Sequence, residues 1–151
     1  MDKLVPRLIG AALATAAASV VLVSGATAPA GRYVISNGTV YDTKTNLTWQ
    51  QAVAPSTYGA TDAVTYCSGL SLNGTGWRLP TYKELVTILD YSVAAPGPMI
   101  DATAFPGTPG NYFNSSTPSA AMAGNVWEVQ FGPGWTDPRG GGPANNVRCV
   151  R

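Results

Sequence analysis

The 151-residue sequence contains no histidine and few charged residues of either sign. Histidine is the commonest general base and a frequent zinc ligand, so its absence removes the usual catalytic triad and most zinc sites. The acidic residues are scattered, without the close pair that acid–base catalysis or a shared metal requires. We therefore predict no catalytic residue, no metal site and no cofactor, expect a protein that is not an enzyme, and interpret the acidic residues as turn, cap or surface groups.

A membrane-spanning run is also missing. The longest apolar run, from Leu8 through Val23, has 16 residues, fewer than the roughly 20 that cross a bilayer. It follows a basic segment and leads into small residues that end at Ala30, which is the pattern of a secretory signal peptide. We predict a signal peptide over residues 1–30, or alternatively an uncleaved anchor, and a single binding domain over residues 31–151. The protein is then exported to the periplasm, the cell surface or the exterior, with no stable membrane span after cleavage.

The predicted mature domain, residues 31–151, has no basic excess, since 7 basic residues face 7 acidic ones. Nucleic-acid binding normally needs a clear basic excess or stripe, so we expect no nucleic-acid partner. Cysteine is scarce as well, with only Cys67 and Cys149 present. In an exported protein these residues form either one disulfide or two free thiols, and we favour the disulfide.

Strands are predicted from alternating apolar and polar residues. Asn37-Gly38 lies between two such segments, which is a strong hairpin signal, and a third strand follows at residues 47–50. Residues 126–131 alternate clearly, and residues 146–150 form a final strand. The segment 132–143 is so rich in glycine and proline that we interpret it as a loop.

Two short helices are expected, over residues 61–70 and from about residue 82 to 90, because apolar residues recur there at helical spacing. Residues 91–111 carry prolines without sustained periodicity, and we predict a long ordered loop anchored by Ile100 and Phe105. The fold class is therefore α+β, with small antiparallel sheets, two short helices and a long-loop region.

A Trp-Arg-Leu-Pro-Thr motif precedes the second helix. Its threonine and the glutamate three residues later have the spacing of a capping box, in which each side chain bonds a free backbone N–H at the helix start. We expect the tryptophan in the core and the arginine bridging backbone carbonyls or a carboxylate such as Asp101. The motif is interpreted as structural, and its residues are Trp77, Arg78, Pro80, Thr81 and Glu84.

Several motifs occur in a fixed order along the chain. They include Asn37-Gly38-Thr39-Val40-Tyr41-Asp42, Trp77-Arg78-Leu79-Pro80-Thr81-x-x-Glu84-Leu85, Trp127-x-Val129-x-Phe131 and Val147-Arg148-Cys149-Val150. With these motifs the chain resembles the bacterial domain family typified by the C-terminal domain of the Legionella collagen-like adhesin. The resemblance implies a C-type-lectin-like fold, in which N-terminal and C-terminal strands pair and a long-loop region presents the binding face.

The chain also departs from the family pattern. Asn114 stands where family members usually have an aromatic residue, and the collagen-like stalk of the namesake is absent. The Glu-Pro-Asn and Trp-Asn-Asp motifs of calcium-dependent sugar-binding lectins of this fold do not occur either. We therefore expect no metal-assisted sugar binding.

Candidate ligand-binding residues lie mainly after residue 105. Trp135 sits in a glycine-rich segment, where it either stacks on a sugar ring or plugs the top of the core. Arg148 alternates away from Cys149 and is expected to lie exposed beside Arg151, as an anion-binding pair or as part of a solvated edge strand. The full candidate set is Tyr112, Asn114, Trp135, Asp137, Arg139 and Arg148.

These observations favour a secreted or surface-exposed bacterial binding module that recognises a polysaccharide or another surface macromolecule, such as a surface protein. One alternative is an oxidoreductase of the formylglycine-generating type, which shares the broad fold and whose relatives use cysteine pairs. Another is a structural unit of a surface assembly. The sequence does not assign an oligomeric state.

Overall fold

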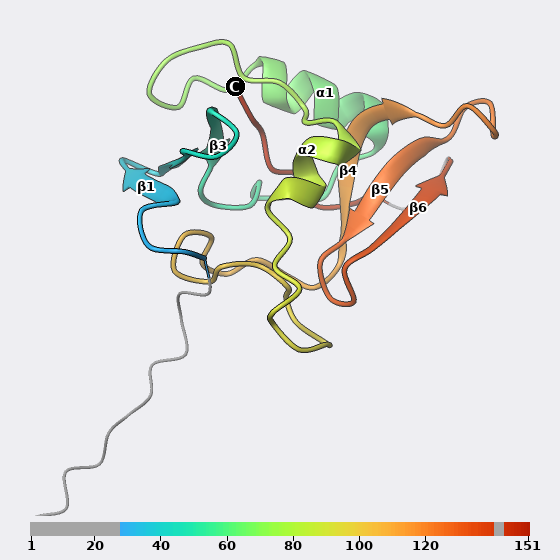
Figure 1. The fold of residues 1–151 in the computed structure, drawn as a ribbon. Coiled ribbons are helices and arrows are strands. Elements are labelled where there is room, and N and C mark those ends of the chain that lie inside the picture. The colour runs from blue at the N-terminus through green and yellow to red at the C-terminus, as the bar shows by residue number, and fades with distance from the viewer. Residues whose placement is uncertain (1–27, 141–143) are drawn as a thin grey trace, which may run out of the picture.

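Two small antiparallel sheets and two short helices form the fold (Figure 1). The computed structural model describes residues 28–140 and 144–151, so the predicted signal peptide lies almost wholly outside the described residues. This architecture confirms the predicted α+β class, whereas the C-type-lectin-like assignment stays a prediction. In chain order the elements are β1 (Tyr33–Ser36), β2 (Thr39–Asp42), β3 (Leu47–Gln50), α1 (Ala60–Ser68), α2 (Tyr82–Thr87), β4 (Tyr112–Pro118), β5 (Val126–Gln130) and β6 (Trp135–Arg139).

The first sheet is the predicted meander, with its strands in the order β1-β2-β3. Ser36 pairs with Thr39 across a two-residue turn. The turn residues Asn37 and Gly38 have φ values of 46° and 78°, as a tight hairpin of this twist requires. The hairpin prediction is therefore confirmed, and its cause is local.

Helix α2 starts at the predicted capping box. Thr81 Oγ1 accepts a hydrogen bond from the Glu84 amide at 3.2 Å, and Glu84 Oε2 accepts one from the Thr81 amide at 2.8 Å. The Arg78 guanidinium donates to both Glu84 oxygens, at 2.9 and 2.6 Å. The expectation that Arg78 bonds a carboxylate is thus correct, but naming Asp101 was wrong. Trp77 is 3% exposed and packs in the core as predicted.

The second sheet has the order β4-β5-β6, and its third strand corrects the sequence analysis. Residues 135–139 were expected to be loop, yet they pair with β5 from Trp135 opposite Gln130 to Arg139 opposite Val126. An edge strand tolerates the proline at position 138 because only one of its sides is paired. The preceding Gly134, with φ of 71°, supplies the turn.

The chain end joins both sheets. Val150 bridges to Trp49 of β3 and to Arg78, and Asn146 bridges to Phe113 of β4. Residues 145–151 therefore form an extended segment with isolated bridges rather than the predicted continuous strand. This segment, red in Figure 1, ends beside β3, where the Thr48 amide donates to the Arg151 carbonyl at 2.8 Å. N-terminal and C-terminal segments are thus paired.

A disulfide fixes this arrangement. Cys67 of α1 and Cys149 of the C-terminal segment are bonded, fully buried and separated by 82 residues. The disulfide prediction is confirmed. Both cysteines of the chain lie in this bond, so neither is a free thiol.

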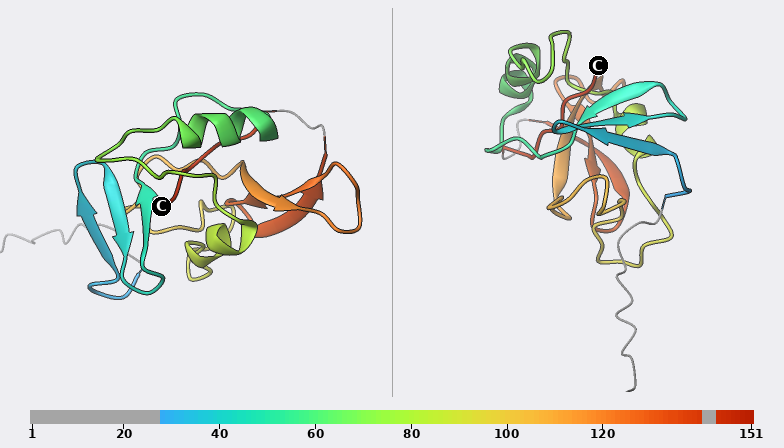
Figure 2. Two further views of the ribbon diagram at one scale, coloured as in Figure 1. Left: turned by 90° about the horizontal axis from the view of Figure 1, so that it is seen from above. Right: turned by 90° about the vertical axis from the view of Figure 1, so that its left-hand side faces the viewer.

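Buried side chains of both sheets, α2 and the long loop form the main core. The left view of Figure 2 shows the two sheets on opposite sides of the domain. Ile100 and Phe105, the predicted loop anchors, are 2% and 0% exposed and pack with side chains of β3, α2 and β5. The loop is therefore ordered by its own packing, as expected. Within the described residues, no helix combines the length and apolar character needed to cross a membrane.

Candidate functional site

The outer face of the second sheet brings together five of the six predicted ligand-binding residues. Residues opposite one another on neighbouring strands point to the same side of a sheet. The inner side carries Phe113 and Val129, both fully buried. The other side, which we call the outer face, carries rows set by the strand register: Tyr112, Gln130 and Trp135 in one row, Asn114, Glu128 and Asp137 in the next, and Arg139 beyond them.

Trp135 is the most open large side chain of the outer face, at 65% exposure. The alternative in which it plugs the core was therefore wrong. Asp137 lies two residues further along the same edge strand and is also exposed. A planar apolar ring and a hydrogen-bond acceptor are thus presented side by side at an open sheet edge, an arrangement suited to ligand contact.

Arg139 lies across the outer face and links its three strands. Its guanidinium carbon is 4.5 Å from the ring centroid of Tyr112 on β4, and its Nε is 3.9 Å from Glu128 Oε2 on β5. The side chain keeps 36% of its surface exposed. Arg139 can therefore meet a ligand while it is held in place by the ring and the carboxylate.

Glu128 was interpreted as a surface group, and this was wrong. The residue is 4% exposed, and its Oε2 accepts no hydrogen bond from the described residues. Burial raises the pKa of this carboxyl, although the positive charge of Arg139 acts to lower it. Sequence analysis missed Glu128 because strand alternation places a side chain on a face without showing what covers it.

Two other acidic residues are buried rather than at the surface, and both accept hydrogen bonds within the turns where they lie, a role that the sequence analysis expected. Asp42 is fully buried and pairs with Arg32 at 3.0 Å. Asp101 is 4% exposed, and its carboxylate accepts hydrogen bonds from the backbone amides of Thr103 and Ala104 at 2.9 Å. Each carboxylate is thus satisfied within the fold.

Asn114 lies under the β4 side of the outer face. It is 2% exposed, its Nδ2 donates to the Tyr58 carbonyl at 2.7 Å, and its Oδ1 accepts from Asn145 Nδ2 at 3.4 Å. These bonds join β4 to the segment before α1 and to the C-terminal segment. In the structure as described, Asn114 therefore supports the face rather than lying open on it.

Arg148 contradicts the sequence analysis most clearly, because it is fully buried rather than exposed. Its guanidinium carbon lies 4.7 Å from the Phe105 ring centroid, and Nη2 donates to the Gln51 carbonyl at 3.1 Å and to Thr108 Oγ1 at 2.9 Å. Burial lowers the pKa of Arg148 to about 9, so it stays charged at neutral pH.

The expected pair of exposed cations is therefore absent. Arg148 does alternate away from Cys149 as predicted, but the loop around Phe105 covers that side of the segment too. Arg151 lies elsewhere, with its guanidinium 4.9 Å from the Trp77 ring. Trp135, Arg139 and Arg148 consequently do not converge on one exposed face, and the open part of the site is formed by Tyr112, Trp135, Asp137 and Arg139.

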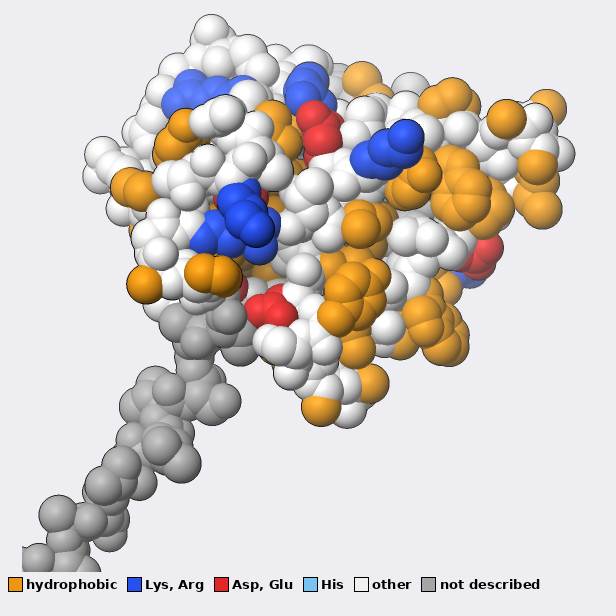
Figure 3. All heavy atoms as spheres, in the orientation of Figure 1, with side chains coloured by type: hydrophobic (Ala, Val, Ile, Leu, Met, Phe, Trp, Pro, Cys, Tyr) orange, Lys and Arg blue, Asp and Glu red, His pale blue; other side chains and the backbone are white. Residues whose placement is uncertain are grey.

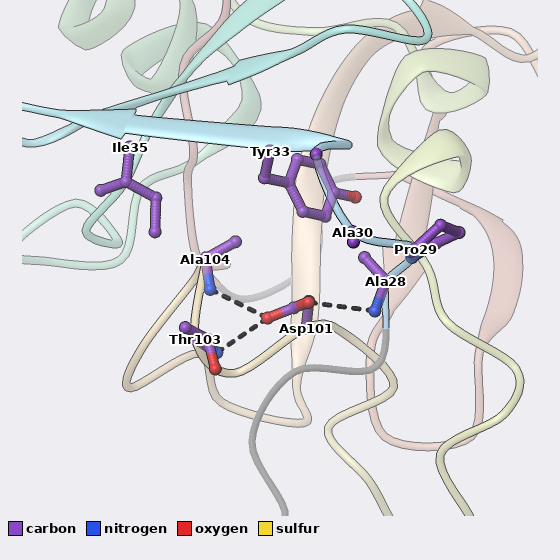
Figure 4. A pocket seen from close by; sticks show the side chains of 9 residues that line it. Ala28, Pro29, Ala30, Tyr33, Ile35, Asp101, Thr103 and Ala104 are labelled. Carbon is purple, nitrogen blue, oxygen red and sulfur yellow. Dashed lines mark hydrogen bonds between the residues drawn. The ribbon is translucent and has the colours of Figure 1, made fainter.

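Two hollows lie away from the outer face's open edge. A groove of about 340 Å³ is lined by α1 and by parts of β4 and β5, with hydroxyls and Val64 but no titratable group. A smaller cavity of about 140 Å³ lies between β1 and the long loop, where Asp101 also accepts a hydrogen bond from the Ala28 amide at 3.0 Å (Figure 4). Across the described ranges, no group of three or more metal-ligating side chains occurs.

Comparison with known proteins gives one match. The family model described as the Lcl C-terminal domain matches residues 38–151. No curated protein and no solved structure matches the chain. The matched residues include β2 and β3 of the first sheet, the whole second sheet, both helices and both cysteines, and β1 lies before them. The chain therefore belongs to the Lcl C-terminal domain family.

Proposed function

We propose that this chain is a binding module without enzymatic activity, and that the outer face of β4–β6 recognises a polysaccharide on a surface. Its family indicates a surface-associated, adhesin-like module, and its disulfide fits an oxidising compartment outside the cytoplasm. A C-type-lectin-like fold, which uses loops and strand ends to present ligand groups, is part of the same proposal.

The observation that carries the proposal is the exposure of Trp135 at 65%, with exposed Asp137 on the same face of the edge strand. A tryptophan ring loses little conformational entropy when it packs on a flat apolar ligand. Carboxylate and guanidinium groups beside it can accept from and donate to sugar hydroxyls. Arg139 is already held by Tyr112 and Glu128, so less ordering is needed on binding.

A glycan array and heparin chromatography on the domain of residues 31–151 test this proposal. Binding to a polysaccharide that falls at least tenfold in Trp135→Ala or Arg139→Ala supports it. Met122→Ala, which removes another exposed apolar side chain, and Lys83→Ala, which removes an exposed cation on α2, serve as matched controls. If the array and the heparin column both show no binding, the proposal is withdrawn.

A further inference from the structure

The loop after α2 places a second exposed aromatic ring against Gly134, the residue before Trp135. Tyr91 is 64% exposed, and its hydroxyl donates to the carbonyl of Gly134 at 3.2 Å. A Cβ atom on Gly134 would lie 2.8 Å from Tyr91 Cε1, so the ring rests directly against the backbone of the residue before Trp135. Figure 3 shows hydrophobic side chains gathered over this loop and the neighbouring β5–β6 region.

The backbone beneath the two rings is fixed by close contacts. The Met99 amide donates to the Phe131 carbonyl at 2.7 Å, and the Gly132 amide donates to the Gly110 carbonyl at 2.8 Å. A Cβ atom on Gly97 would lie 2.8 Å from the Gly132 carbonyl oxygen, so only glycine permits this approach. The segments that carry Tyr91 and Trp135 are therefore held together before any ligand arrives, which lowers the entropy cost of binding.

Both rings expose most of their surface. In the part of the chain that the structure describes, neither Tyr91 nor Trp135 makes a ring–ring or cation–ring contact. Among the described residues, every other exposed large apolar side chain is less exposed than Tyr91 and Trp135. Two open aromatic rings on a fixed support mark a binding surface rather than scattered surface apolar groups.

Neighbouring polar groups indicate the charge of the ligand. Gln130 lies opposite Trp135 and offers an amide, and Asp137 offers an exposed carboxylate on the same side of β6. Arg139 lies further along β6, where it can still donate to a hydroxyl while the nearby carboxylate of Glu128 offsets its positive charge. An uncharged sugar can donate its hydroxyls to Asp137, whereas a sulfated or carboxylated sugar at this position would be repelled by it.

We infer that Tyr91 and Trp135 form an aromatic subsite that takes the apolar faces of uncharged pyranose units in a polysaccharide. This inference rests on the proposed function and specifies the ligand class. Tyr91 supplies one ring, Trp135 supplies the other, and Gln130 and Asp137 bond to hydroxyls at the ring edges.

The test measures binding of soluble galactomannan and dextran, with heparin as the anionic probe, to the domain of residues 31–151. We expect a dissociation constant for at least one neutral polysaccharide that rises tenfold or more in Tyr91→Ala and in Trp135→Ala. Tyr41→Ala removes an exposed tyrosine on β2, outside the proposed subsite, and should change the dissociation constant less than twofold. Tyr91→Phe keeps the ring and should retain most of the affinity.

Tryptophan fluorescence gives a second readout, because Trp49 and Trp77 are buried, Trp127 is half-buried and stacked on Tyr82, and Trp135 is open. A neutral polysaccharide should protect the emission from acrylamide quenching in the wild type but not in Trp135→Ala. If Tyr91→Ala does not fold, Trp135→Ala on the edge strand still decides the question.

Outcomes separate the two proposals. Binding to heparin without binding to either neutral polysaccharide overturns the aromatic subsite but leaves the proposed function standing. Neutral binding that is unchanged in both ring variants also overturns the subsite. Absence of binding to every polysaccharide tested removes the proposed function as well.

Discussion

Reducing the Cys67–Cys149 disulfide should strongly destabilise the domain. The bond closes a loop between residues 82 positions apart, and the entropy it removes from the unfolded chain corresponds to roughly 4.5 kcal/mol. Small domains are stable by only about 5 to 15 kcal/mol, so this is a large share of the total. Since both cysteines are fully buried, the native contacts around them contribute separately.

Urea unfolding of the oxidised and reduced domain measures the effect. With a slope of about 1 to 2 kcal/mol per molar urea, reduction should lower the midpoint by about 2 to 4.5 M. Reduction is a better perturbation than Cys67→Ala with Cys149→Ala, because alanine would also leave a cavity. A midpoint shift below about 0.5 M would show that loop closure is not what the disulfide contributes, and would refute the reasoning.

Three further substitutions test the helix cap and the buried cation. Thr81→Ala removes the acceptor for the Glu84 amide and should cost about 1 kcal/mol in thermal unfolding; an unchanged melting temperature contradicts the cap. Hydrogen bonding from Arg78 lowers the pKa of Glu84 from 4.5 to about 2, so its stabilisation is full above pH 4.5 and is lost as pH falls towards 2. Glu84→Gln keeps the cap and should flatten stability over that window, and equal acid sensitivity would count against the ion pair. Arg148→Lys keeps the charge but loses the planar contact with Phe105 and a hydrogen bond, so it should lower the free energy of unfolding in urea by about 2 to 3 kcal/mol. A loss below about 1 kcal/mol would argue against a stabilising role of the buried guanidinium.

Features with a local cause were predictable from sequence. The Asn37-Gly38 turn needs only two residues that accept positive φ, and the Thr81–Glu84 cap needs only a three-residue spacing. The disulfide followed from the number of cysteines and the predicted compartment. The turn and the cap depend on residues that are close together in the sequence, and the two cysteines have no other cysteine with which to pair.

Features that depend on what lies above or beside a segment were not predictable. The composition of residues 132–143 indicated a loop, but pairing with β5 made residues 135–139 a strand. Alternation showed correctly that Arg148 points away from Cys149, yet it could not show that Phe105 covers that side. Tyr91 lies in no recognised motif, and its hydrogen bond to Gly134 is what connects it to the candidate site.

The position of the C-terminal segment has a consequence for how the chain folds during synthesis. The first hairpin pairs residues fewer than 10 apart and can form as soon as it emerges. The Gln50 amide, by contrast, bonds the Cys149 carbonyl, and the Ala54 amide bonds the Val147 carbonyl. Until these last residues arrive, the open edge of β3 and the Cys67 thiol have no native partners. The domain therefore completes its fold only when the C-terminal segment is available. Until then, the unpaired edge of β3 can pair with non-native strands, and slow synthesis prolongs this period.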